Sequence, residues 1–305
     1  GEQQTRIAYE TQGMTWWADY NVIYDESRGC SMDLSGWVSI INQSGASFEN
    51  AKLKLIAGDV NRAEPQRNRR DVVMKMAMAE DAAAPFAEKA FFEYHLYTLG
   101  RPADLPNNST KQLQLFPTAR GVECEKELVF APTLNMGYYG YQQLDQEYGR
   151  YGQGDIDVYL RFENEKSRNL GMPLPAGRIR VMQQDPADDS LEFIGEDVID
   201  HTPRNEEVLI EMGKAFDVVG ERKQTDFRVD TRTRNLWETF EIRLRNHKEQ
   251  AVNVAVLENL YRMANWKLEG VSHEWDKENS NRIRFDVSIP SEGEAVITYT
   301  AHYSW

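Results

Sequence analysis

The stretch from Asp155 to Asp197 constrains the fold of this chain more than any other feature. Its first part alternates apolar and polar residues, with four apolar side chains in one phase: Ile156, Val158, Leu160 and Phe162. This period of two is typical of a β-strand with one face in a core and the other in water. Residues 164–177 then bring prolines and glycines, which favour a turn. Two further strands, 178–182 and 191–194, are separated by the Asp-rich turn 185–189, so the stretch is predicted to fold as strand, turn, strand, turn, strand.

The same rule recurs along the chain without a helical pattern between the strands. Three strands are predicted before residue 58, and short alternating strands return from residue 240 to the end. A chain of 305 residues exceeds the usual size of one small domain. We therefore predict an all-β fold of two packed β-sandwich domains, residues 1–226 and 227–305, with the C-terminal domain immunoglobulin-like.

Two segments interrupt the strand pattern. Residues 61–90 are rich in alanine, methionine and charge, and their apolar residues form no continuous stripe, so we predict a mobile insertion. A methionine-rich binding segment is the alternative. Residues 136–154 combine five tyrosines with five glycines, a composition suited to a long exposed hairpin loop.

Seven segments, in order along nearly the whole chain, carry a family resemblance: GMTWWADYN, LSGWVSIINQSG, FENAKLKLIAGDVNR, EYHLYTLGRPADL, NLGMPLPAGRIRVM, FIGED and FDVVGERKQTDF. They resemble the domain of unknown function that forms the C-terminal half of mucoidy-inhibitor-A-like proteins. In full-length members this region follows another domain and a coiled-coil stretch. The resemblance implies a bacterial cell-envelope protein and no established catalytic residues.

Composition and net charge limit the classes of partner that this chain is expected to bind. Hydrophobic residues make up 41% and charged residues 28% of the chain, and no apolar run reaches the length of a membrane span. A formal net charge of −14 disfavours nucleic acid and anionic membrane surfaces. The chain starts at Gly1 without a basic, apolar leader, so we expect any signal peptide to have been removed. A periplasmic or cell-surface location, with a protein or glycan partner and no direct membrane insertion, is the expectation.

The two cysteines, Cys30 and Cys124, fall in the apolar phase of predicted strands. Because cysteine packs readily as a small hydrophobic residue, we predict two buried free thiols, with a disulfide as the alternative.

No segment carries a catalytic or cofactor motif. The chain contains no Gly-x-Ser-x-Gly elbow, and the glycines of residues 149–154 lack the spacing of a dinucleotide loop. The sequence around His273 has no second histidine at the spacing of a zinc protease. We therefore predict no catalytic, metal or cofactor-binding residues. A carbohydrate-active enzyme that uses a separated Asp/Glu pair is the alternative.

The Gly/Tyr loop near 136–154 is the candidate recognition site. Tyrosine offers a broad ring and a hydroxyl group at little entropic cost, and glycine supplies the conformations that binding loops need. The candidate recognition residues are Tyr138, Tyr139, Tyr141, Tyr148 and Tyr151. A flexible hairpin tip without a binding role is the alternative.

Overall fold

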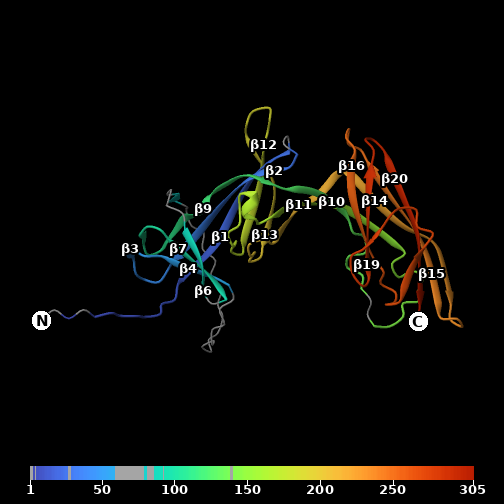
Figure 1. Ribbon diagram of the computed structural model, residues 1–305, viewed down its shortest axis with the longest axis horizontal. Helices are drawn as coiled ribbons and strands as arrows, with labels where there is room; N and C mark the ends of the chain where they lie inside the picture. Colours follow the sequence, from blue (N-terminus) through green and yellow to red (C-terminus); the bar gives the residue numbers. More distant parts are fainter. Residues whose placement is uncertain are drawn as a thin grey trace. The chain divides into compact units, whose positions relative to one another are not determined.

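The structure is a computed structural model (Figure 1) that describes Gln3 and residues 5–26, 29–58, 79–80, 86–91, 93–137 and 140–305. Within these residues the chain folds into strands and turns, with one short 3-10 helix, η2 (Lys166–Arg168), and no α-helix. The prediction of an all-β protein built from packed sheets is confirmed. No helix in the described part of the chain is long and apolar enough to span a membrane.

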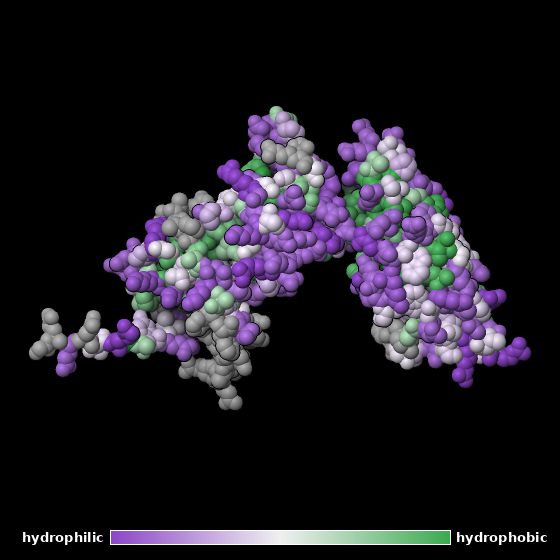
Figure 2. Space-filling view, in the orientation of Figure 1, coloured by the Kyte–Doolittle hydropathy of each residue, from purple (hydrophilic) through white to green (hydrophobic). Residues whose placement is uncertain are grey.

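The chain divides into two compact units. Unit 1 comprises Gly1–Glu125 and Arg161–Ile210, and unit 2 comprises Lys126–Leu160 and Glu211–Trp305. Each unit is therefore built from two separate segments of the chain. The visible face of both is mostly hydrophilic, with hydrophobic residues exposed in smaller groups (Figure 2).

Unit 1 is built on a sheet that, in the described residues, has the strand order β13-β12-β1-β2-β9-β5. Its strands are β1 (Met14–Asp25), β2 (Ser31–Asn42), β5 (Ala79–Glu80), β9 (Ser109–Glu123), β12 (Gly177–Gln184) and β13 (Leu191–Ile199). β1 pairs antiparallel with β2 and parallel with β12. The predicted strands and hairpin of residues 178–194 therefore form this edge of the sheet.

Two smaller sheets complete unit 1. Their strands are β4 (Lys54–Ala57), β7 (Tyr94–Leu99) and β6 (Phe86–Phe91) in one, and β3 (Phe48–Ala51) and β8 (Ala103–Leu105) in the other. Buried tyrosines connect the β1 sheet and the β4-β7-β6 sheet to one proline-containing loop. Tyr20 of β1 donates a hydrogen bond to the carbonyl oxygen of Pro175, and Tyr97 of β7 donates to that of Pro173.

Strand β6 corrects part of the predicted insertion at residues 61–90. Residues 86–90 belong to β6, where Phe86 is buried opposite Leu99 of β7. Residues 79–80 form β5 beside β9. The remaining positions of the insertion, 61–78 and 81–85, lie outside the described residues. Among the side chains of β6 that the structure describes, Phe86 alone is buried, which explains why the sequence gives no alternating strand pattern there.

Cys30 and Cys124 form a disulfide, with Cα atoms 5.2 Å apart. The prediction of two free thiols is wrong. β2 and β9 pair antiparallel with Ser31 opposite Glu123, so the adjacent cysteines meet at one end of this strand pair. Neither cysteine lies in the inward phase of a strand, because Cys30 occupies a turn with φ 88° and Cys124 lies between β9 and the next strand.

Unit 2 is built on a sheet whose described strands have the order β17-β20-β15-β14-β11-β10-β16-β19-β18. The strands are β10 (Glu125–Phe130), β11 (Tyr151–Glu163), β14 (Glu207–Asp230), β15 (Asn235–Asn246), β16 (Val252–Asn259), β17 (Trp266–Glu269), β18 (Asp276–Lys277), β19 (Arg282–Ile289) and β20 (Glu294–Ser304). The ring of Tyr299 on β20 lies 5.5 Å from Phe240 of β15 and 5.8 Å from Phe285 of β19. Strands from both ends of this sheet therefore share one core.

The boundary of unit 2 differs from the predicted division at residues 226 and 227. Its core contains Leu128, Phe130, Ile156 and Val218, which the predicted boundary assigns to the N-terminal domain. β14 also runs without a break through that boundary. The inward phase of β14 explains the difference: it carries Gly220, Arg222 and Gln224, so no apolar alternation marks this half of the strand.

Candidate functional site

The Gly/Tyr segment forms a loop between β10 and β11, residues 131–150, which we call the 131–150 loop. Of the predicted recognition residues, Tyr141 is 59% exposed and Tyr148 is partly buried. Tyr138 and Tyr139 lie outside the described residues. Tyr151 begins β11, and the structure does not describe its side chain.

Arg262 anchors the second half of the 131–150 loop through hydrogen bonds to its backbone. Its guanidinium is fully buried and donates through Nη1 to the carbonyl oxygens of Gln143, at 2.8 Å, and Asp145, at 2.9 Å. Nη2 donates to the carbonyl oxygen of Tyr148 at 2.8 Å. The remaining donor, Nε, bonds Glu238 at 2.6 Å. Three carbonyl groups of the loop are thus bonded by one side chain of unit 2.

Arg222 holds the end of the same loop. It lies against the ring of Phe240, 3.6 Å from the ring centroid, and donates through Nε to both carboxylate oxygens of Glu258. Its Nη1 donates to the carbonyl oxygen of Gly149 at 2.6 Å, and the hydroxyl of Tyr261 donates to the same oxygen at 3.2 Å. Position 149 requires glycine, because φ is +73° and a Cβ atom there would lie 2.0 Å from the Tyr261 oxygen.

Asn259 holds the start of the loop. Its Nδ2 donates to the carbonyl oxygens of Thr133, Leu134 and Met136, at 2.9, 3.1 and 3.0 Å. Its Oδ1 accepts a hydrogen bond from Arg282 Nε at 2.9 Å. The composition of residues 136–154 predicts a long exposed hairpin loop and gives no sign of these anchors. In the structure the backbone of the 131–150 loop is bonded at its start, middle and end.

The two carboxylates beneath the loop are also fully engaged. Glu238 accepts from Tyr303 at 3.1 Å, and Glu258 accepts from Tyr299 at 2.6 Å, in addition to their arginine partners. Burial raises the pKa of both glutamates, and the neighbouring guanidinium groups oppose that rise. Burial alone would lower the pKa of Arg222, but Glu258 reverses this effect and the pKa is raised. Because neither carboxylate reaches solvent, the pair supports the loop and cannot contact a substrate.

The outer side of the loop presents apolar groups to solvent. Leu134 is 47% exposed, Leu144 is 36% exposed and Tyr141 is 59% exposed. Tyr148 turns inward, with its ring 5.4 Å from that of Tyr261 in an edge-on arrangement. The arrangement places one tyrosine and two leucines outside a loop whose polar backbone groups are bonded to the protein.

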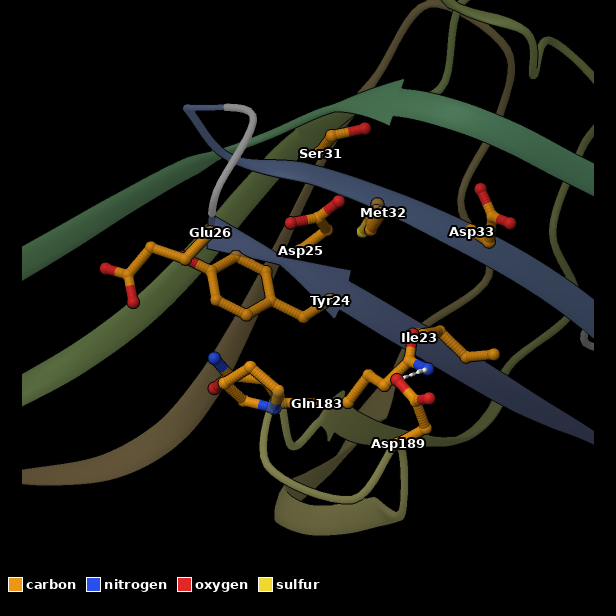
Figure 3. A pocket seen from close by; sticks show the side chains of 11 residues that line it. Ile23, Tyr24, Asp25, Glu26, Ser31, Met32, Asp33, Gln183 and Asp189 are labelled. Carbon is orange, nitrogen blue, oxygen red and sulfur yellow. Dashed lines mark hydrogen bonds between the residues drawn. The ribbon is translucent and has the colours of Figure 1, made fainter.

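A separate cavity in unit 1 is lined by several carboxylate side chains (Figure 3). It has a volume of about 470 Å³ and is lined by Asp25, Glu26, Asp33 and Asp189. Gln184 donates to Asp189 at 3.1 Å across its edge. Burial, with help from Glu26 and Asp25, raises the pKa of Tyr24 in its wall to about 12. In the described part of the chain, no group of three or more His, Cys, Asp or Glu side chains is placed to hold a metal ion.

Comparison with known proteins finds no family model, no curated protein and no solved structure that matches this chain. The site therefore has to be interpreted from its own geometry.

Sequence reasoning missed the residues that hold the loop, although a signal for them exists. Arg222, Glu238 and Glu258 each occupy the inward phase of a strand, in line with buried apolar neighbours. A charged residue in that phase is buried, and a buried charge requires a partner. Three such positions, one each on β14, β15 and β16, indicate an internal ionic cluster.

Proposed function

We propose that this chain is a noncatalytic β-sandwich protein of the bacterial cell envelope that binds a partner through the 131–150 loop. One observation carries the proposal: the fully buried guanidinium of Arg262 donates hydrogen bonds to three carbonyl oxygens of the loop. A loop held in one conformation loses less entropy on binding. Tyr141, Leu134 and Leu144 then form the contact surface.

A protein partner is favoured over a glycan. Sugars stack on the faces of aromatic rings, whereas a loop that exposes two leucines and one tyrosine suits an apolar protein surface. The identity of these three side chains matters more for affinity than the surface area they bury, because a few well-placed side chains dominate the binding free energy of an interface.

A photo-crosslinking amino acid at position 141 tests the proposal. We expect one specific adduct with an envelope protein, abolished when Leu144 is replaced by serine. Phe216 of unit 2 is 94% exposed, so the same crosslinker at 216 is the matched control and should give no such adduct. Equal adducts from both positions would contradict the proposal, and binding on a glycan array that requires Tyr141 would identify a glycan partner instead.

Three further features support the remaining parts of the proposal. The resemblance to the mucoidy-inhibitor-A-like family suggests the envelope location, and the disulfide of unit 1 is compatible with an oxidising compartment. The antiparallel pairs β14–β15, β15–β20 and β16–β19 around one core support an immunoglobulin-like arrangement for unit 2.

A carbohydrate-active enzyme is the second candidate function, and the carboxylates of the unit 1 cavity favour it. Hydrolysis of a glycosidic bond needs two carboxyl groups about 5 to 10 Å apart. Measurable hydrolysis of polysaccharides by the purified protein, lost on Asp33→Asn, would establish this function. Tyr24, the aromatic residue in the cavity wall, is only 4% exposed, so a sugar has no ring face on which to stack there.

A further inference from the structure

Unit 1 contains a second cavity with the opposite charge. Its volume is about 720 Å³, and it lies between residues 116–120 of β9 and the segment 166–172. A smaller cavity of about 340 Å³ shares Lys166, Gly171 and Arg204 with it. The two hollows therefore adjoin along a common wall.

Three cations surround this cavity: Arg120, Lys166 and Arg204. All three are exposed, and no carboxylate lines the larger hollow. Within the described residues, no carboxylate forms an ion pair with any of them, although the chain carries a formal net charge of −14. Three like charges in one concave surface repel one another and add no stability, so their grouping requires another explanation.

The two acidic side chains nearest to Lys166 in sequence are engaged elsewhere. Glu163 lies 3.8 Å from Arg168, and Glu165 accepts from the hydroxyl of Ser167 at 2.6 Å. In the smaller hollow, His95 bonds Glu88 at 2.8 Å. The positive charge of the larger cavity is therefore not neutralised by any residue that lines it.

A fully buried asparagine fixes the wall that carries the cations. Asn164 donates through Nδ2 to the carbonyl oxygens of Met172, at 2.7 Å, and Pro203, at 2.9 Å. Its Oδ1 accepts from the Gly171 amide at 3.0 Å. The Lys166 segment and the Arg204 turn are thus held together through one side chain, and the cavity is preformed.

The third cation is tied to the same wall. Asn169 adopts φ 64° and donates through Nδ2 to the carbonyl oxygen of Arg120 at 2.9 Å. On the floor, Phe116 is buried against Gly36, where even a Cβ atom would lie 2.3 Å from the ring. Leu170 and Met172 add further apolar lining. An apolar floor under a cationic rim suits an organic molecule with anionic groups.

We propose that this cavity binds a small organic anion through carboxylate or phosphate oxygens held by Arg120, Lys166 and Arg204. Arginine recognises both groups with paired hydrogen bonds, and lysine adds a compact charge. The volume is in the range of small-molecule sites. The net negative charge of the chain opposes such a ligand at long range, so recognition depends on contact within the cavity.

Titration calorimetry with three probes tests the proposal: trigalacturonic acid, inorganic pyrophosphate and maltotriose. Trigalacturonic acid supplies carboxylates, pyrophosphate supplies phosphate, and maltotriose is a neutral sugar of the same size as the first. We expect binding of at least one anion and none of maltotriose, with affinity that falls as sodium chloride is added. Binding of only one anion identifies its group as the ligand chemistry, and binding of both identifies a general oxyanion site.

The variants Lys166→Glu and Arg204→Glu should each weaken that binding by about tenfold or more, because each removes a charge-assisted contact and adds repulsion. Lys52→Glu, a reversal at another exposed lysine of unit 1, is the matched control. Equal affinity in wild type and both cavity variants, binding of maltotriose as tightly as the anions, or no anion binding at roughly millimolar concentration overturns the proposal. The 131–150 loop belongs to unit 2, so Leu144→Ser should leave this binding unchanged, and the two proposals succeed or fail separately.

Discussion

Arg262 and Glu238 form an ion pair of 2.6 Å in which neither side chain reaches solvent. The desolvation cost of such a pair offsets most of its attraction, so it adds little net stability. The ion pair holds the other N–H donors of Arg262 in position to bond the carbonyl oxygens of the 131–150 loop. The pair thereby connects the strand β15 to the conformation of a loop far away in sequence.

Replacing Arg262 with methionine should lower the free energy of unfolding by about 3 to 5 kcal/mol, because Glu238 remains buried without its cation. The loop loses three backbone partners in the same variant. Urea denaturation measures the first effect, and faster amide hydrogen exchange across residues 143–149 measures the second. Arg232→Met, in an exposed turn of unit 2, is the control and should change stability by less than about 0.5 kcal/mol. A loss below about 1 kcal/mol for Arg262→Met would show that the pair is dispensable.

Two glycines of the loop allow a matched comparison. Gly149→Ala should cost about 2 to 4 kcal/mol, because the added Cβ atom meets the Tyr261 oxygen and the positive φ is strained. Gly140 also has a positive φ, +84°, but a Cβ atom there meets nothing within 4 Å. Gly140→Ala should therefore cost only about 1 kcal/mol. Thermal melts of both variants test the difference, and equal costs would mean that Tyr261 moves aside.

The alternation of apolar residues predicted most of the fold because it reports directly on burial. It predicted the strands between residues 155 and 194, whose inward side chains are Ile156, Leu160, Ile179 and Val181. It failed in the second half of β14, where the inward positions after Val218 hold Gly220, Arg222 and Gln224. The predicted domain boundary differs from the observed one for the same reason.

The support of the 131–150 loop could not be predicted from local pattern. Arg262 bonds the carbonyl oxygen of Gln143, a residue 119 positions away, and a backbone acceptor carries no sequence signal. The prediction of two free thiols was wrong for a related reason. Its two cysteines are 94 residues apart and meet only because β2 pairs with β9 in one register. Pairings of this kind depend on tertiary structure rather than on the residues that flank each partner.

The disulfide predicts the outcome of thiol labelling. In denatured protein without reductant, neither Cys30 nor Cys124 should react with an alkylating agent, and both should react after reduction. A closed loop of this length restricts the unfolded chain, so replacing both cysteines with serine should lower stability by about 2 to 5 kcal/mol. Reductant should lower the stability of the wild type and leave that of the double variant unchanged. Full alkylation before reduction would show that the thiols are free.

Buried tyrosines of unit 1 predict a loss of stability at alkaline pH. Burial raises the pKa of Tyr20 and of Tyr97 in the folded protein, whereas unfolding returns both to about 10. The unfolded chain therefore releases protons above pH 10 that the folded chain retains, and stability falls as the pH rises. Tyr24, with a pKa of about 12, acts in the same direction. Below pH 10 these groups are protonated in both states and cause no such fall.

Urea denaturation between pH 8 and 11 measures this slope, and Tyr97→Phe isolates one contributor. The variant loses the hydrogen bond to Pro173, so it should be less stable by about 1 kcal/mol at pH 8. Above pH 10 its stability should decline less steeply, by up to about 1.4 kcal/mol per pH unit, because one proton fewer is released on unfolding. The two curves should therefore converge as the pH rises. Parallel curves would mean that Tyr97 ionises equally in both states and that its burial does not control the alkaline limit.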